Sequence, residues 1–394
     1  MKTPRFSRLA SSAVMVLFAL CTGAIAQTTT PPMGWNSWNF YGLKLHAPPT
    51  DAAIRAQAAA MVNSGMQAVG YTYINIDDEW QGTRDANGNI QPNPNNFPYG
   101  MAALAQYVHG LGLKIGIYSS PGPTTCSGHI GSFGYEQQDA NTFASWGMDF
   151  LKYDWCSATG IPKTVYQLMY NALQTTGRPI VYSISNYGKA ETWKWANSVS
   201  GADMWRTTQD VKDEYYVMAE NGFGNDGLQP YSGPTKGWND ADMLQIGNGG
   251  MTVSQYRTQM TLWCILSSPL IAGNDLTQLL NNNKTDQEYL ALLTNPAVIA
   301  VDQDSRGAQG YRVWQVGLQE IWKKPMSDGS TVVGIFNRGL GSATVALPFK
   351  EIGVSGTVDA YDLWAQKGLG PIKSGYQVQV VQQGAVMLKL TAAK

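Results

Sequence analysis

The chain has 394 residues, enough for one large domain and a smaller one, and 44% of them are apolar. Charged residues make up 14%, against roughly 25% in an average globular protein, and the formal net charge is −1. Without a long basic or acidic run, the sequence does not indicate electrostatic binding to nucleic acid or to an anionic membrane.

The first 26 residues are predicted to be a cleavable signal peptide. Three cations precede an apolar run at 9–21 that is too short for a comfortable membrane span, and the small residues at 24–26 fit the cleavage rule. A lipoprotein interpretation of Cys21 is the alternative, although the residue before it fits that motif poorly. The mature protein is therefore expected to begin near Gln27 and to be secreted or periplasmic.

Eight short apolar runs follow, separated by about one helix each, and we predict them to be strands. Amphipathic stretches such as 51–65 and 100–113 are predicted helices between them. This alternation is typical of a parallel sheet covered by helices, and eight units favour a (β/α)₈ barrel over residues 27–304. An open doubly wound sheet is the alternative, weakened because no GxGxxG follows the first strand. The predicted strands are 33–38, 71–78, 114–121, 148–154, 179–185, 203–210, 240–247 and 265–273.

Residues 305–394 have a different pattern, in which apolar and polar residues alternate between turn signals such as "SDG" and "NRG". A period of two residues predicts antiparallel strands that are buried on one face. We therefore predict a C-terminal antiparallel β-sandwich domain appended to the barrel.

Three cysteines lie beyond the predicted signal peptide. Cys264 sits in an apolar run and is expected to be a buried free thiol, which leaves Cys126 and Cys156 as the expected disulfide. The alternative is that all three are inert core thiols.

The chain holds three histidines, and none lies near another or near a cysteine pair in the sequence. A zinc site and a Ser-His-Asp triad are therefore poorly supported, and we expect no metal or other cofactor. Acid–base chemistry would fall to carboxylates.

Polar side chains gather where the predicted strands end, and in a barrel these ends converge on the face that carries active sites. Helix N-capping could explain any one of the aspartates, but not Lys152 or Arg206, since a helix N-terminus repels cations. The residues at these ends are Asp77, Asp78, Tyr118, Lys152, Asp154, Ser185, Arg206, Asp210, Asp240 and Asp242.

Tryptophans accompany the strand ends as well. The apolar face of a sugar stacks on indole while its hydroxyls need charged or amide partners, so tryptophan beside carboxylates suits a pyranose site. The alternative is that these are core side chains of a large barrel. The tryptophans are Trp35, Trp38, Trp80, Trp155, Trp205 and Trp238.

Paired carboxylates without histidines or a metal cluster indicate glycoside hydrolysis. Asp154 is the candidate nucleophile. Lys152, two residues earlier in an extended strand, points to the same side and is expected to keep Asp154 ionised. Asp210 is the candidate acid/base, with Arg206 four residues earlier as its expected partner.

Six motifs in order make the sequence resemble glycoside hydrolase family 27, which contains α-galactosidases and α-N-acetylgalactosaminidases. They are "PPMGWNSWN", "YINIDDEW", "KIGIYSSPGPTTC", "FLKYDWC", "WRTTQDV" and "GWNDADMLQIGNGGMT". The resemblance implies a retaining two-step mechanism with Asp154 as nucleophile and Asp210 as acid/base, and a disulfide between Cys126 and Cys156. It also implies sugar-binding roles for Trp38, Asp77, Asp78, Tyr118, Lys152, Arg206 and Asp242.

The same resemblance bears on which sugar is bound. Asp77 and Asp78 would hold O4 and O6, which implies an axial O4 and an intact hydroxymethyl group. Ser185 and Tyr187 stand where the family recognises position 2 of the sugar. The small Ser185 resembles the acetamido-specific animal enzymes, whereas the aromatic Tyr187 resembles plant-type galactosidases and favours galactose.

The expected activity is therefore exo-acting α-galactosidase, on oligo- or polysaccharide α-galactosides. The alternatives within the family are α-N-acetylgalactosaminidase and β-L-arabinopyranosidase, and the latter sugar lacks the hydroxymethyl group that Asp77 and Asp78 would bind. A non-catalytic galactose-binding protein is the alternative from another class, but it would need neither Asp154 nor Asp210.

Overall fold

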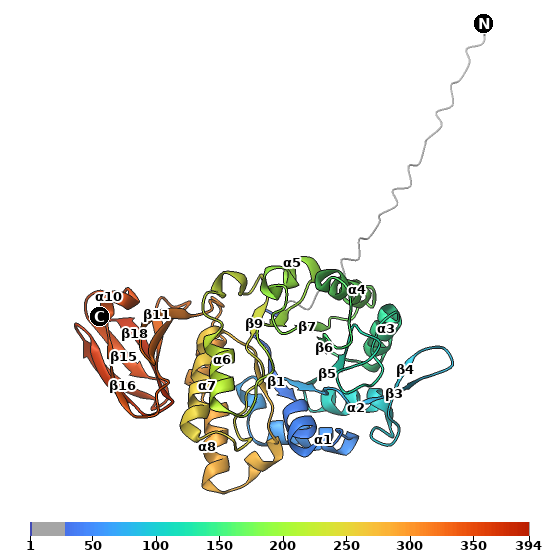
Figure 1. The fold of residues 1–394 in the computed structure, drawn as a ribbon, viewed down its shortest axis with the longest axis horizontal. Coiled ribbons are helices and arrows are strands. Elements are labelled where there is room, and N and C mark those ends of the chain that lie inside the picture. Colours follow the sequence, from blue (N-terminus) through green and yellow to red (C-terminus); the bar gives the residue numbers. More distant parts are fainter. Residues whose placement is uncertain (2–27, 394) are drawn as a thin grey trace.

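The computed structural model describes residue 1 and residues 28–393, so the predicted signal peptide lies outside the described residues. The large domain is built on an eight-stranded parallel sheet in the order β10-β1-β2-β5-β6-β7-β8-β9 (Figure 1). A parallel bridge from Leu244 to Ala272 links the segment after β9 to β10. The predicted barrel is confirmed. Its strands are β1 (Met33–Asn36), β2 (Tyr73–Asn75), β5 (Lys114–Ser119), β6 (Phe150–Asp154), β7 (Val181–Ser185), β8 (Met204–Arg206), β9 (Trp238–Asp240) and β10 (Leu270–Ala272).

Helices follow most of these strands and surround the sheet in Figure 1. N-capping residues mark where two of these helices begin. Thr50 before α1 accepts a hydrogen bond from the amide of Ala53, and Thr252 before α7 forms a capping box with Gln255. The helices are α1 (Asp51–Asn63), α2 (Gly100–Gly110), α3 (Glu136–Trp146), α4 (Pro162–Thr175), α5 (Ala196–Ser200), α6 (Tyr215–Phe223), α7 (Val253–Leu266), α8 (Lys284–Leu293) and α9 (Pro296–Asp302). A hairpin of β3 (Gln81–Arg84) and β4 (Ile90–Pro92) projects between β2 and α2.

Two predicted strands are wrong in their position. The run 240–247 is mostly a loop, because Asp242, two residues after the end of β9, adopts a left-handed backbone with φ of 80°. The run 265–273 is divided: its start belongs to α7, which ends where Ser267 adopts φ of 52°, and its end is β10. In both cases the apolar residues are buried in the core without continuous strand pairing.

The C-terminal residues form the predicted antiparallel β domain. One sheet has six strands in the order β11-β12-β13-β18-β15-β16, and β14 pairs with β17 in a second. Apolar side chains of both sheets share one core, which includes Ile321, Val333, Val345 and Leu388. The elements are β11 (Tyr311–Val316), β12 (Gln319–Pro325), β13 (Thr331–Asn337), β14 (Ala343–Leu347), α10 (Phe349–Ile352), β15 (Val358–Asp362), β16 (Lys367–Ile372), β17 (Tyr376–Val380) and β18 (Gly384–Ala392).

The β domain stands beside α6 and α7 (Figure 1), and a buried lysine joins it to the barrel. Lys324 on β12 donates from Nζ to the carbonyl of Cys264 at 3.0 Å and to Ser267 Oγ at 2.6 Å. Burial lowers the pKa of Lys324 to about 8. Cys264 is buried and, within the described chain, is a free thiol as predicted.

Among the helices of the described residues, none has the length and apolar character needed to cross a membrane.

Candidate active site

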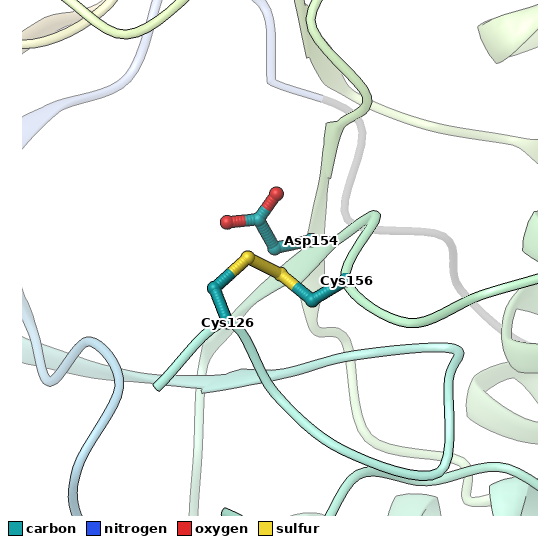
Figure 2. Close-up of side chains that lie close together, drawn as sticks. All are labelled: Cys126, Asp154 and Cys156. Carbon is teal, nitrogen blue, oxygen red and sulfur yellow. A yellow bond between two sulfur atoms is a disulfide. The ribbon is translucent and has the colours of Figure 1, made fainter. Parts of the chain in front are cut away.

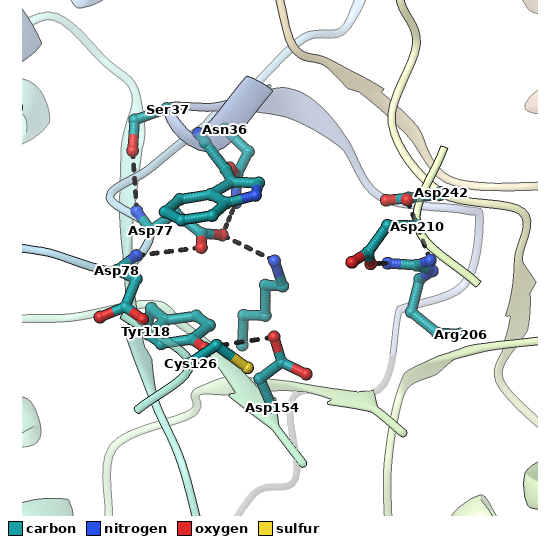
Figure 3. A network of polar contacts seen from close by, with 12 residues as sticks. Asn36, Ser37, Asp77, Asp78, Tyr118, Cys126, Asp154, Arg206, Asp210 and Asp242 are labelled. Atoms are coloured by element: carbon teal, nitrogen blue, oxygen red, sulfur yellow. Dashed lines mark hydrogen bonds and ion pairs between the residues drawn. The ribbon is translucent and has the colours of Figure 1, made fainter. Parts of the chain in front are cut away.

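The carboxyl ends of the barrel strands surround a pocket with about 380 Å³ of empty space. Figure 3 shows Asp77, Asp78, Tyr118 and Asp154 on one side of it, and Arg206, Asp210 and Asp242 on the other. Strand ends therefore bring together residues that are far apart in the chain, as expected for a barrel. The lining residues are Trp38, Asn39, Asp77, Asp78, Tyr118, Cys126, Lys152, Asp154, Tyr187, Asp210, Asp242 and Met243.

Asp154 ends β6 and is buried at the pocket wall. Its Oδ2 accepts a hydrogen bond from the hydroxyl of Tyr118 at 3.2 Å, whereas its Oδ1 has no hydrogen-bond partner among the described residues. Burial raises the pKa of Asp154, and the positive charge of Lys152 and the nearby polar side chain of Tyr187 oppose this rise. One carboxylate oxygen of Asp154 is thus held in place and the other is free to react.

Lys152 forms its ion pair with Asp77, not with Asp154. Its Nζ lies 2.8 Å from Asp77 Oδ2, which also accepts from Asn36 Nδ2 at 2.7 Å. Burial alone would lower the pKa of Lys152, but Asp77 and then Asp154 raise it. The charge of Lys152 opposes the rise in the pKa of Asp154, but burial is the larger influence, and the ion pair that Lys152 forms is with Asp77.

Arg206 ends β8 and holds two carboxylates. One guanidinium nitrogen lies 3.1 Å from Asp210 Oδ1, and the other lies 2.9 Å from Asp242 Oδ2. The Asp210 side chain is 62% exposed, whereas that of Asp242 is 5% exposed. Asp210 therefore stands at the mouth of the pocket and Asp242 stands inside it.

The disulfide between Cys126 and Cys156 is present and lies close to Asp154 (Figure 2), and Cys126 lines the pocket. The Tyr118 hydroxyl lies 3.4 Å from Cys156 Sγ. The loop that carries Cys126 is held in a second way, because the amide of Ser127 donates to Asp78 Oδ2 at 2.9 Å. Sulfur atoms and a carboxylate oxygen of Asp154 lie within 4.8 Å of one another, but the disulfide leaves no thiolate there to bind a metal ion.

Thiol titration tests this pairing. For the protein produced from Gln27 onward, denatured without reductant, we expect one reactive thiol, that of Cys264, and three after reduction. A Cys264→Ser variant is the matched control and should show none before reduction. Three thiols without reductant would contradict the disulfide.

Ser185 and Tyr187 occupy different environments after β7. Ser185 pairs with Asp154 in the strand register, and its Oγ is buried without a partner in the described part of the chain. It is not among the described residues that line the pocket, whereas Tyr187 is. Tyr187 adopts φ of 60°, a costly conformation for a bulky residue and one that often marks functional sites.

The tryptophan prediction is largely wrong. Trp35, Trp80, Trp205 and Trp238 are fully buried core residues, and Trp155 packs partly buried against the core. Trp38 is the tryptophan that lines the pocket. Indoles of this size close to a strand end are drawn into the barrel core by burial of their apolar surface.

The sequence analysis missed Asn39 and Met243, which line the pocket, and Asn36, which lines the adjoining hollow. Asn36 ends β1 and donates to Asp77, and Asn39 follows three residues later in "GWNSWN", so the same strand-end criterion could have found both. Met243 is apolar and carries no such signal. Asp240 and Arg206 line an adjoining hollow inside the barrel, where Asp240 accepts from the amide of Asp242 at 2.8 Å.

A parallel barrel whose strand ends place two aspartates across a polar, aromatic-lined pocket is the architecture of a carbohydrate-active enzyme. The profile described as "Alpha galactosidase A" matches residues 30–304, and the "Alpha galactosidase C-terminal beta sandwich domain" matches residues 316–390. The chain belongs to the α-galactosidase family, glycoside hydrolase family 27, as the sequence resemblance predicted.

Individual relatives support the same family assignment. A probable α-galactosidase of Dictyostelium discoideum is 42% identical over 390 residues, which cover 97% of each chain. The α-galactosidase of Cyamopsis tetragonoloba is 42% identical over 367 residues, covering 92% of this chain and 86% of the relative. The crystal structure of α-galactosidase I from Mortierella vinacea has a TM-score of 0.85 at 35% identity, covering 93% of this chain and 98% of that one.

Proposed function

We propose that the protein is an exo-acting α-galactosidase that works by double displacement, with Asp154 as nucleophile and Asp210 as acid/base. The observation that carries this proposal is the unequal placement of two carboxylates in one pocket. Asp154 is buried with one unpartnered oxygen, and Asp210 is exposed at the mouth beside Arg206. A nucleophile must meet the anomeric carbon inside the pocket, whereas an acid/base must exchange protons with solvent.

In the first step, a carboxylate oxygen of Asp154 attacks the anomeric carbon of the α-galactoside. The glycosidic bond breaks, and the carboxylic acid of Asp210 gives its proton to the departing oxygen. A β-galactosyl ester of Asp154 results. In the second step, Asp210 takes a proton from water, whose oxygen attacks the anomeric carbon and releases α-galactose and the Asp154 carboxylate.

The remaining polar groups suit the hydroxyls of galactose. Asp77 and Asp78 are proposed to accept hydrogen bonds from O4 and O6, while Lys152 donates. Asp77 already accepts hydrogen bonds from Asn36, Lys152 and the amide of Asp78. Its two carboxylate oxygens have further lone pairs that can accept from a sugar hydroxyl. Trp38 offers an apolar face to the sugar, and Asp242 and Arg206 are proposed to bind the hydroxyls on the far side.

Hydrolysis of three nitrophenyl glycosides side by side tests the proposed function. We expect the α-galactoside to be hydrolysed with the highest kcat/KM, because the bulky Tyr187 lines the pocket and is proposed to leave no room for an acetamido group. The β-L-arabinopyranoside should be slower by roughly 10- to 200-fold, since it lacks the hydroxymethyl group. Preference for the α-N-acetylgalactosaminide would contradict the proposal for galactose, and no hydrolysis of any of the three would contradict the proposed activity.

We further propose that the catalytic barrel spans 27–304 and the β domain 305–394, and that the protein is secreted or periplasmic after cleavage near Ala26. The change from strand–helix alternation to a period of two residues near 305 and the predicted signal peptide at 1–26 support this organisation.

A further inference from the structure

The loop after β9 carries a carboxylate, that of Asp242, which is bound to the segment that carries Asp210. Asp242 Oδ2 accepts a hydrogen bond from the backbone amide of Val211 at 2.7 Å and lies 2.9 Å from a guanidinium nitrogen of Arg206 (Figure 3). Val211 directly follows Asp210 in the chain, and Arg206 forms an ion pair with Asp210 at 3.1 Å. One buried oxygen of Asp242 therefore holds both the backbone next to Asp210 and the side chain that pairs with it.

The carboxylate of Asp210 has little other support. Its side chain is 62% exposed, and among the described residues Arg206 is the one partner that binds it. The direction of an exposed carboxylate with one partner depends on that partner and on its own backbone. Since Asp242 binds to both, the position of Asp210 depends on the position of Asp242.

Asp242 is in turn fixed by two buried side chains. Its backbone is left-handed, with φ of 80°, which costs on the order of 1–3 kcal/mol in a residue other than glycine and persists only where the surroundings impose it. The amide of Asp242 donates to Asp240 Oδ1 at 2.8 Å, and its carbonyl accepts from Trp263 Nε1 at 2.7 Å. Asp240 and Trp263 are both buried, so these bonds are shielded from water and impose the conformation.

The position of Asp210 matters because of the role proposed for it. A general acid must lie within hydrogen-bond reach of the oxygen that it protonates, and a displacement of about 1 Å can cost on the order of 10²-fold in rate. Groups that hold Asp242 should therefore affect proton transfer by Asp210, even though Trp263 and Asp240 do not line the pocket.

We propose that Asp242 is a positioning residue for the acid/base Asp210, and that Asp240 and Trp263 hold Asp242 in the conformation that this requires. The inference rests on the proposed function, because it takes Asp210 as the acid/base. It adds a second role to the proposed contact of Asp242 with a sugar hydroxyl, and it gives α7, which carries Trp263, a part in catalysis.

The test compares two substrates that share one sugar and differ in their leaving group. Methyl α-galactoside has a poor leaving group that needs an acid, whereas dinitrophenyl α-galactoside has a good one that does not. Any loss of sugar binding cancels in the ratio of their kcat/KM values, and a loss of acid catalysis does not. In Asp242→Asn the ratio of methyl to dinitrophenyl substrate should fall roughly tenfold, because a neutral amide no longer pairs with Arg206. Asparagine also tolerates the left-handed backbone.

Trp263→Phe probes the same arrangement from α7. The change removes the Nε1–H donor and keeps most of the aromatic bulk, so the ratio should fall about fivefold, as for the loss of one hydrogen bond. Trp322→Phe is the matched control. Trp322 is equally buried, and its Nε1 donates to Glu320 Oε2 at 2.9 Å on β12 of the other domain. Its ratio should match that of the unaltered protein, even where thermal unfolding shows a lower Tm.

A ratio in Asp242→Asn that stays within twofold of the unaltered protein would show that Asp242 only binds the sugar and would overturn the positioning role. An unchanged ratio in Trp263→Phe, or an equal fall in Trp322→Phe, would overturn the part assigned to Trp263. If Asp242→Asn does not fold, Trp263→Phe decides the question. Asp210→Ala, measured alongside, separates the two proposals: if its ratio falls while the others do not, the proposed function stands and the positioning role fails. If its ratio is unchanged, both fail.

Discussion

Replacing Asp154 with asparagine is expected to lower kcat on nitrophenyl α-galactoside by on the order of 10⁴-fold or more, as removal of a nucleophile does in other covalent mechanisms. The amide has nearly the shape of the carboxylate but cannot form the galactosyl ester. Because Asp154 is buried with its Oδ2 bound to Tyr118, the amide oxygen can keep that hydrogen bond and the fold should persist. Steady-state kinetics and thermal unfolding of the same preparation measure the two effects.

Asp359→Asn is the matched control for this experiment. Asp359 lies on β15 in the C-terminal domain with an exposed side chain, so the same chemical change is made far from the pocket. It should leave kcat unchanged. An Asp154→Asn protein that unfolds normally and keeps more than about a tenth of the activity would contradict the assignment of Asp154 as nucleophile, because loss of the nucleophile should leave on the order of 10⁻⁴ of the activity or less.

Asp210→Ala is expected to reduce activity in a way that depends on the leaving group. Without the acid, substrates with poor leaving groups should lose roughly 10²- to 10⁴-fold in kcat/KM, whereas nitrophenyl substrates with low leaving-group pKa need little protonation and should lose far less. Hydrolysis of the galactosyl ester should then limit kcat, since no base activates water. Added azide should restore turnover and yield α-galactosyl azide, because this anion displaces Asp154 from the β-galactosyl ester with inversion and needs no base.

The geometry makes Asp210→Ala a specific perturbation. Asp210 is exposed, and Arg206 keeps its 2.9 Å ion pair with Asp242 when Asp210 is removed. Asp210→Asn is the comparison variant because it keeps the size of the side chain. It should lose acid–base function as Asp210→Ala does, since an amide cannot transfer the proton. A loss that is equal for all leaving groups, together with no response to azide, would contradict the role of Asp210.

Much of the fold and of the site follows from local pattern in the sequence. Near-continuous apolar runs identified the parallel strands, since such strands are buried on both faces. Because those strands point the same way, charged residues that follow them had to meet at one edge, and Asp77, Asp154 and Arg206 do lie around the same pocket or the hollow beside it. The alternating pattern after 305 identified the antiparallel domain for a similar reason.

Side-chain partners were decided by the tertiary structure. Alternation along β6 correctly placed Lys152 and Asp154 on one side, but the ion pair of Lys152 is with Asp77, 75 residues away. The curvature of the sheet determines which charge is nearest, and this cannot be read from one strand. The sequence by itself therefore determined which residues reach the carboxyl edge of the barrel, because strand direction and period are local properties. Only the tertiary structure decided which of them touch and which tryptophans enter the core, because packing between distant segments sets those distances.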